Sequence, residues 1–330
     1  MSSPPAPVSL GPTERPTTVR RVFAQPVVYW AAVGVLLLAT SGYALTRWAA
    51  AGNAHLRIGG DYQLSPIRTV TIWAAQATIF IVCAWLAVWV IRQCLRERRL
   101  TFDASLYIAF LLQSLYGPVI DARVVAHYTT AAWYLPTWAT YYPTSSRWAQ
   151  PDAADKIQPV LVDGFAYGTG IFFGLIALYA TNWVWRLRRK PITINAGYIA
   201  ALLVACIIAD FLMEVGWISS GAYCYRKAIP ALTLFPGHWY QIPLYHSVII
   251  GIFWFGILMV VRQIYHAKGP DATLVLKGIN HLPARVRPYV QTLALSGLAN
   301  LCVLALTVGG WLLIAIPGGA LPPDLPPHFR

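Results

Sequence analysis

The chain has 330 residues, of which 57% are hydrophobic and 11% are charged. Soluble domains carry about 25% charged residues, so this composition excludes an ordinary soluble protein and favours a membrane protein. The formal net charge of +13 would suit nucleic acid, but the basic residues stand in short clusters beside apolar segments, so no nucleic-acid partner is expected.

The two ends of the chain are rich in proline and poor in large apolar residues. Residues 1–25 contain five prolines together with Ser and Thr, a composition that cannot build a core. They predict a disordered cytoplasmic tail. Residues 318–330 contain four prolines and predict a second, outer tail of the same kind. The transmembrane domain is therefore expected over residues 26–317.

Between these tails, apolar stretches long enough to cross a bilayer follow one another, since about 20 residues suffice for a helix. Seven are predicted: 22–46, 69–91, 104–120, 164–185, 191–209, 245–261 and 290–316. All should be helical, because an unpaired backbone amide in lipid costs several kcal/mol. The expected fold is all-α, a polytopic membrane bundle of about seven transmembrane helices with long aromatic outer loops.

Basic residues predict the orientation of this bundle. With seven spans, 16 Lys and Arg residues fall on the side of the N-terminus and 9 on the opposite side. The positive-inside rule then predicts a multi-pass protein of the cell membrane, with its N-terminus in the cytoplasm and its C-terminus outside. Asp103 and His266 fall on the cytoplasmic side, where we expect solvated positions.

Two outer connections, residues 121–159 and 220–243, are rich in aromatic residues and prolines. Such loops either anchor the protein in the membrane interface or fold over the bundle as a lid that faces a substrate, and the sequence leaves both open. The side chains predicted to bind a substrate lie in or next to these connections and are Trp217, Tyr223, Tyr225, Trp239, Tyr240, Arg123 and His127.

Five ionisable residues are predicted at one depth, toward the outer side. Asp210 and Glu214 are four residues apart within apolar sequence, which places both on one helix face. Asp121 ends the third span, Asp163 begins the fourth and His246 begins the sixth. Because the chain alternates in direction, all three should stand at the same end of the bundle as the acidic pair.

An ionisable side chain inside a membrane costs about 2.5 to 3.5 kcal/mol on insertion scales and normally faces a bundle interior or a wet cavity. Two neighbouring carboxyl groups can supply an acid beside a base, which suits general acid/base catalysis and proton-coupled transport equally. A structural alternative is that the pair only bonds to neighbouring helices or to Arg123. Asp121, Asp163 and His246 could equally be helix-end residues at an interface.

Two motifs carry a resemblance to a known family. The first is the acidic pair Asp210 and Glu214 followed by Tyr223-Cys-Tyr225, and the second is Gly237-His-Trp-Tyr-Gln-Ile-Pro243 before the next span. Together they resemble the AveC-like spirocyclases, actinobacterial membrane proteins associated with polyketide spiroketals. The resemblance implies closure of a dihydroxy-ketone polyketide to a spiroketal, sometimes with dehydration.

These observations support a membrane cyclase or dehydratase that uses acid/base catalysis on an amphiphilic polyketide or isoprenoid-like molecule in the bilayer. The expected catalytic residues are Asp210, Glu214, Asp121, Asp163 and His246, without a cofactor. No CxxC or HExxH motif is present, so no metal is expected. The alternative is a proton-coupled carrier or lipid-binding membrane protein that uses the same carboxylates. The sequence makes no prediction of oligomeric state.

Overall fold

The computed structural model describes residues 24–121, 126–148, 157–161, 164–189, 191–310 and 322–329. Almost all of the predicted N-terminal tail therefore lies outside the described residues, as do Arg123 and Asp163. The described part is mostly helical, with three short pairs of antiparallel strands.

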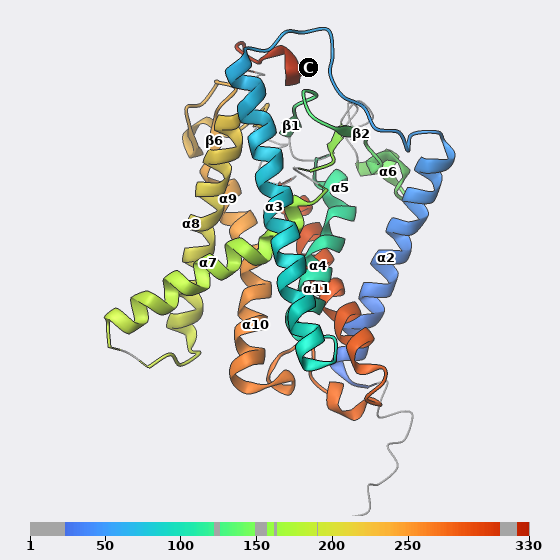
Figure 1. Cartoon of the computed structure of the whole chain (residues 1–330), viewed down its shortest axis with the longest axis vertical. Helices are drawn as coiled ribbons and strands as arrows, with labels where there is room; N and C mark the ends of the chain where they lie inside the picture. The colour runs from blue at the N-terminus through green and yellow to red at the C-terminus, as the bar shows by residue number, and fades with distance from the viewer. Residues whose placement is uncertain are drawn as a thin grey trace, which may run out of the picture.

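Six helical segments are long and apolar enough to cross a membrane. They are α2 (Pro26–Ala50), α3 (Pro66–Glu97), α4 (Phe102–Gln113) with η1 (Ser114–Tyr116) and α5 (Gly117–Asp121), α8 (Ala196–Ser220), α9 (Leu244–Ile250) with the π-helical η5 (Gly251–Gly256) and α10 (Ile257–Lys268), and α11 (Arg287–Gly310). Figure 1 shows them running roughly along the long axis of the molecule.

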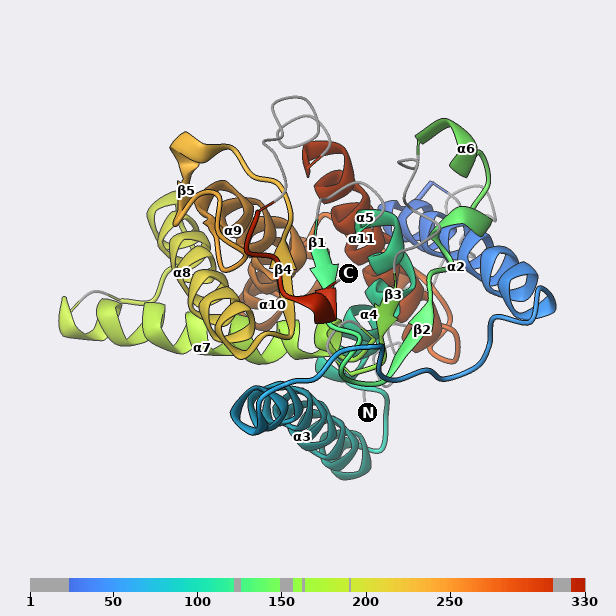
Figure 2. The same ribbon diagram turned by 90° about the horizontal axis from the view of Figure 1, so that it is seen from above.

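The fourth predicted span corresponds to α7 (Ala166–Leu187), which is not among these six. Polar residues such as Thr181, Asn182 and Arg186 reduce the hydropathy of its second half. Figure 2, which looks nearly along the other helices, shows α7 lengthwise, so this helix lies obliquely across the bundle. The prediction of a helical bundle is confirmed, but the count of seven spans is not.

Consecutive helices alternate in direction along the long axis (Figure 1). This alternation gathers the aromatic connections and the C-terminal segment at one end, the upper end in Figure 1. The helices α2 and α11 approach very closely, because a Cβ added at Gly34 would lie 2.1 Å from the Leu293 carbonyl oxygen and one added at Gly297 would lie 2.3 Å from that of Trp30. Small residues commonly allow such backbone contact between membrane helices.

The aromatic connections form a cap at the upper end. Strand β1 (Ala126–Tyr128) pairs with β4 (Tyr223–Tyr225), which joins the two predicted aromatic loops; β2 (Tyr134–Pro136) pairs with β3 (Ile157–Pro159), and β5 (Thr233–Leu234) with β6 (Ile242–Pro243). Short helical turns complete the described structure: η2 (Ala139–Tyr141), α6 (Ser145–Trp148), η4 (Pro230–Leu232), η6 (Pro270–Ala272), η7 (Ile279–His281) and η9 (Pro327–Phe329).

The C-terminal segment 322–329 packs against this cap. Its proline content predicts disorder, whereas Leu325 and Phe329 are buried in a cluster with Cys224 of β4. The Thr130 amide donates a hydrogen bond to the His328 carbonyl at 2.9 Å. The proline content alone predicts disorder, but the large side chains of Leu325 and Phe329 hold the segment against the cap.

Asp103 corrects another expectation, that this carboxylate is solvated. Its side chain is buried at the start of α4, where Arg262 of α10 donates two hydrogen bonds to it, at 2.8 and 2.9 Å. His266, one turn further along α10, lies 3.3 Å from the same carboxylate. The sequence shows each charge only at the end of an apolar segment, whereas the fold places the two segments side by side.

Candidate active site

Helix α8 extends further at its C-terminal end than the sequence predicts, and this extension carries the acidic pair. The Asn195 side chain caps its start by accepting a hydrogen bond from the Tyr198 amide at 2.9 Å. The helix ends at Gly221, whose φ of 83° is the left-handed conformation that glycine tolerates best. The chain then turns back as β4, so the side chain of Tyr225 returns over that of Glu214.

Glu214, Tyr225 and His246 form a buried cluster. The Tyr225 hydroxyl donates a hydrogen bond to Oε2 of Glu214 at 3.0 Å and lies 2.5 Å from Nδ1 of His246. The same nitrogen lies 3.9 Å from Oε1 of Glu214. Their exposed fractions are 4%, 1% and 8%, so protein shields all three groups from water. A carboxyl group, a phenol and an imidazole thus meet in one small volume.

This geometry permits two arrangements of protons, because a phenol hydroxyl has only one hydrogen to donate. In the first, Tyr225 donates to the Glu214 carboxylate and His246 donates its Nδ1 proton to the phenol oxygen. In the second, a protonated Glu214 donates to the phenol, which donates to His246. Exchange between them moves one proton from histidine to carboxylate through the phenol, and such a relay is a means of acid/base catalysis.

Asp210 lies one helical turn away and is fully buried. Neither of its carboxylate oxygens has a hydrogen-bond partner among the described residues. The Ser247 hydroxyl is near enough to interact with it, but without the geometry of an ordinary hydrogen bond. An unpartnered buried carboxyl group is costly, which marks Asp210 as a group able to receive the polar atoms of a bound molecule.

An aromatic row runs from the cluster toward α3. The Tyr225 ring lies 5.6 Å from that of Tyr223, which lies 6.3 Å from that of Trp217. Burial raises the pKa of both tyrosines well above the usual value, so their hydroxyls stay protonated at neutral pH. The Tyr223 hydroxyl is also buried and is near enough to the Glu214 carboxyl group and the Tyr225 hydroxyl to interact with both, but without the geometry of an ordinary hydrogen bond.

Comparison with known proteins assigns the chain to a family. A family model described as "Spirocyclase AveC-like" matches residues 97–330. The chain belongs to this family. None of the curated proteins and none of the solved structures matches it. Membership implies a cyclase-type enzyme, and the matched range includes every residue of the buried cluster.

Three further residues predicted to bind substrate lie in the cap, away from the buried cluster. Trp239 packs beneath the Arg68 guanidinium, whose central carbon is 5.0 Å from the ring centre. Tyr240 is 37% exposed and stacks on His238. His127 lies 3.2 Å from the Phe329 carbonyl oxygen and accepts a hydrogen bond from Arg226 at 2.7 Å. The contacts of all three hold the cap together.

Other predicted positions cannot be compared in the same way. Asp121 is the last residue of α5, but its side chain is not described, and Arg123 and Asp163 lie outside the described residues. Their suggested roles stay predictions. The residues that the fold does bring together are Asp210, Glu214, Trp217, Tyr223, Tyr225 and His246.

Sequence reasoning missed a residue that holds the cluster in place. Gln241 is 3% exposed, and its side-chain amide donates a hydrogen bond to the Tyr225 carbonyl at 2.8 Å. Its side-chain oxygen accepts from the Gly237 amide at 3.3 Å. The signal was present, since Gln241 is the amide of the motif Gly-x-x-Tyr-Gln-x-Pro, but only the fold shows that it fixes β4.

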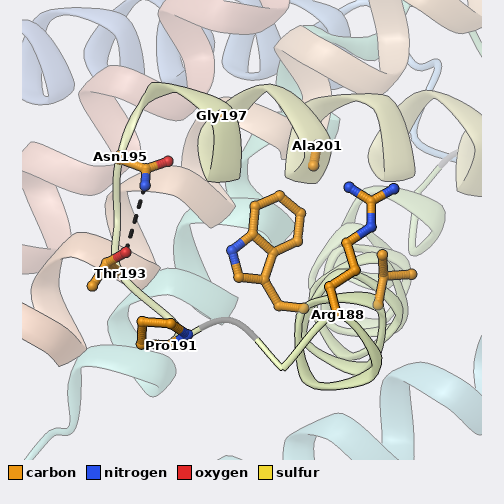
Figure 3. A pocket seen from close by; sticks show the side chains of 8 residues that line it. Arg188, Pro191, Thr193, Asn195, Gly197 and Ala201 are labelled. Atoms are coloured by element: carbon orange, nitrogen blue, oxygen red, sulfur yellow. Dashed lines mark hydrogen bonds between the residues drawn. The ribbon is translucent and has the colours of Figure 1, made fainter.

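Two further hollows lack the chemistry of the cluster. One, of about 490 Å³, lies at the turn between α7 and α8, and Figure 3 shows Arg188, Thr193 and Asn195 around it. The amide of Asn195 donates there to the Thr193 hydroxyl. The other, of about 460 Å³, is mainly apolar and lies between α2, α5 and α11. Neither is lined by a carboxyl group or a histidine, so the buried cluster remains the candidate active site.

Proposed function

We propose that this chain is a multi-pass enzyme of the cell membrane that closes an amphiphilic dihydroxy-ketone polyketide to a spiroketal by cofactor-free general acid/base catalysis. One observation carries the proposal: the Tyr225 hydroxyl joins the Glu214 carboxyl group to the His246 imidazole inside the protein. In this proposal the N-terminus lies in the cytoplasm and the cluster in the outer half of the bundle, as the positive-inside rule predicts.

Spiroketal formation requires proton transfers and no oxidation. One hydroxyl of the substrate adds to the protonated ketone carbon and loses its proton, which gives a hemiketal. The hemiketal hydroxyl is then protonated and leaves as water, and an oxocarbenium ion forms. The second hydroxyl adds to this ion and loses a proton. The balance is one dihydroxy ketone to one spiroketal and one water.

The residues of the cluster match these transfers. Glu214 in its acid form would donate a proton to the departing oxygen, and His246 would take up the proton of the attacking hydroxyl. Tyr225 carries the proton between them, which restores the starting state after each transfer. Asp210, buried without a partner among the described residues, would hold a substrate hydroxyl. The faces of Trp217 and Tyr223 would stabilise the cation by about 0.5 to 2 kcal/mol each.

The competing function is a proton-coupled carrier or a lipid-binding protein, for which the same carboxyl groups would relay protons. A carrier leaves its ligand chemically unchanged. Membranes that contain the protein are therefore incubated with a synthetic long-chain dihydroxy ketone, and the extract is analysed by mass spectrometry and chiral chromatography. We expect loss of one water and an excess of one spiroketal stereoisomer over membranes without the protein. An unchanged ligand, or the stereoisomer mixture of the spontaneous reaction, would refute the cyclase.

A further inference from the structure

A groove of about 530 Å³ lies between α3, α7 and α8, beside the candidate active site. Its walls are mainly apolar and include Ala75 of α3, Phe173 of α7, and Leu212 and Trp217 of α8. Its polar lining residues are Thr and Ser, and no charged side chain lines it. The groove therefore suits a neutral, largely apolar molecule, since a charged group would lie there without a counter-ion.

The groove reaches the cluster through the aromatic row. Trp217 lines the groove and is the outermost ring of the row that continues through Tyr223 to Tyr225. Gln76, next to Ala75 in α3, is 1% exposed, and neither its side-chain oxygen nor its nitrogen has a partner among the described residues. Buried polar groups are nearly always hydrogen-bonded. The Gln76 amide, in the helix that forms one wall of the groove, and the Tyr223 hydroxyl, which makes no ordinary hydrogen bond in the aromatic row, are thus available to bond the polar atoms of a bound molecule.

The upper end of the groove is closed by contacts between α3 and the end of α8. Arg68 donates a hydrogen bond to the Ser219 carbonyl at 2.8 Å, and the Thr71 hydroxyl donates to the Ser220 carbonyl at 3.0 Å. Above them, the Arg68 guanidinium lies over Trp239, which packs on Phe329 of the C-terminal segment. Because these contacts close its upper end, the groove opens toward the side of the bundle, where exposed residues such as Leu212 lie.

We infer that the groove between α3 and α8 binds the apolar arm of a neutral long-chain substrate and admits the molecule sideways from the lipid. Trp217 stands at its inner end, and Gln76 and Tyr223 receive the first oxygen atoms of the molecule. The identity of the ligand rests on the proposed function, but its binding does not, because the groove lies outside the proton relay. Binding and turnover can therefore be measured separately.

Gly216 provides a way to fill the groove without disturbing the fold. It lines the groove, and a Cβ added there would meet no atom within 4 Å. Gly216→Leu therefore directs a side chain into the groove, and replacing a helical glycine favours the helix by about 1 kcal/mol. Gly42 of α2 provides the matched control, since it is also an exposed helical glycine with open space at its Cβ.

The experiment uses the full chain in lipid nanodiscs and a neutral long-chain ketone that carries a photoreactive diazirine and an alkyne. After irradiation, labelled peptides are mapped by mass spectrometry, with and without excess unlabelled long-chain dihydroxy ketone. We expect competable labelling within residues 71–78 and 212–220, reduced about tenfold by Gly216→Leu, as overfilling a binding site predicts, and unchanged by Gly42→Leu. Gly216→Ala should give an intermediate result and replaces Gly216→Leu if that variant does not fold.

The outcomes separate this inference from the proposed function. Labelling in Glu214→Gln should equal that of the wild type, because the relay does not line the groove. If the wild type shows competable labelling but no turnover, the groove is still the binding site and the proposed cyclase activity is refuted. Three outcomes would overturn the groove as the binding site, even if turnover is observed: the labelling is not competed, it falls in other peptides, or Gly216→Leu leaves it unchanged.

Discussion

The Tyr225 hydroxyl lies 2.5 Å from Nδ1 of His246, and this contact joins strand β4 to the start of helix α9. It brings together residues 21 positions apart across the aromatic connection, with Glu214 of α8 as the third partner. The cap and the bundle therefore meet at the cluster to which we assign the chemistry.

Removal of the Tyr225 hydroxyl should interrupt the proton relay. Tyr225→Phe keeps the ring but leaves Glu214 and His246 without their shared partner, so we expect turnover of a long-chain dihydroxy ketone to fall about 100-fold, a typical loss for general acid/base catalysis. Tyr289→Phe is the matched control, because Tyr289 is 70% exposed in the first turn of α11, at the opposite end of the bundle. Equal rates in the two variants would show that the hydroxyl has no part in the reaction.

The ion pair of Asp103 and Arg262 should stabilise the opposite end of the bundle. Asp103→Asn leaves the Arg262 guanidinium, whose side chain is only 13% exposed, without its bidentate partner, and we expect a loss of about 3 kcal/mol in the free energy of unfolding. Unfolding in detergent, followed by tryptophan fluorescence, measures this loss. Glu97→Gln removes only an exposed pair with Arg99 and should cost less than about 1 kcal/mol. Arg262→Gln combined with Asp103→Asn should recover part of the loss, and an additive double variant would contradict this account.

Docking of the C-terminal segment should weaken in acid because of His328. Its side chain is 2% exposed, its ring lies beside that of Tyr62, and burial and the nearby Arg68 lower its pKa from 6.5 to about 4. The docked state therefore favours neutral histidine. Docking is therefore strongest above pH 6.5 and weakens as the pH falls toward 4. Below pH 4, protonation of His328 causes no further weakening.

Hydrogen exchange of residues 322–329 measures this docking directly. His328→Asn should abolish the change between pH 6.5 and 4, whereas His238→Asn removes the pair with Asp324 and should leave the change in place. Equal protection at pH 7 and pH 4.5 in the wild type would refute the assignment to His328.

The acidic pair and His246 could be predicted from sequence for clear physical reasons. Asp210 and Glu214 are charges within apolar sequence at a spacing that fixes them on one helix face, and alternation of the spans predicts the depth of His246. Local spacing cannot show which side chain joins them. The bridging role of Tyr225 depends on the turn at Gly221, which returns β4 over α8.

Contacts between distant segments were beyond the sequence. Asp103 was predicted to be solvated because Arg262 is 159 residues away in the sequence. The C-terminal segment was predicted to be disordered because its composition does not show its contacts with Thr130 and Cys224. The oblique course of α7 across the bundle was likewise not predicted. Hydropathy identifies an apolar segment but does not predict how the axis of its helix is oriented in the bundle.

Turnover of a long-chain dihydroxy ketone by Glu214→Gln, compared with Glu97→Gln, tests the central claim most directly. Both variants replace a glutamate by its amide, but Glu214 lies in the buried cluster and Glu97 is a surface residue paired with Arg99. The spiroketal is quantified by mass spectrometry in membranes with equal amounts of folded protein. We predict a fall of about 100-fold or more for Glu214→Gln and wild-type turnover for Glu97→Gln. Undiminished spiroketal formation by Glu214→Gln would contradict the assignment of catalysis to this cluster.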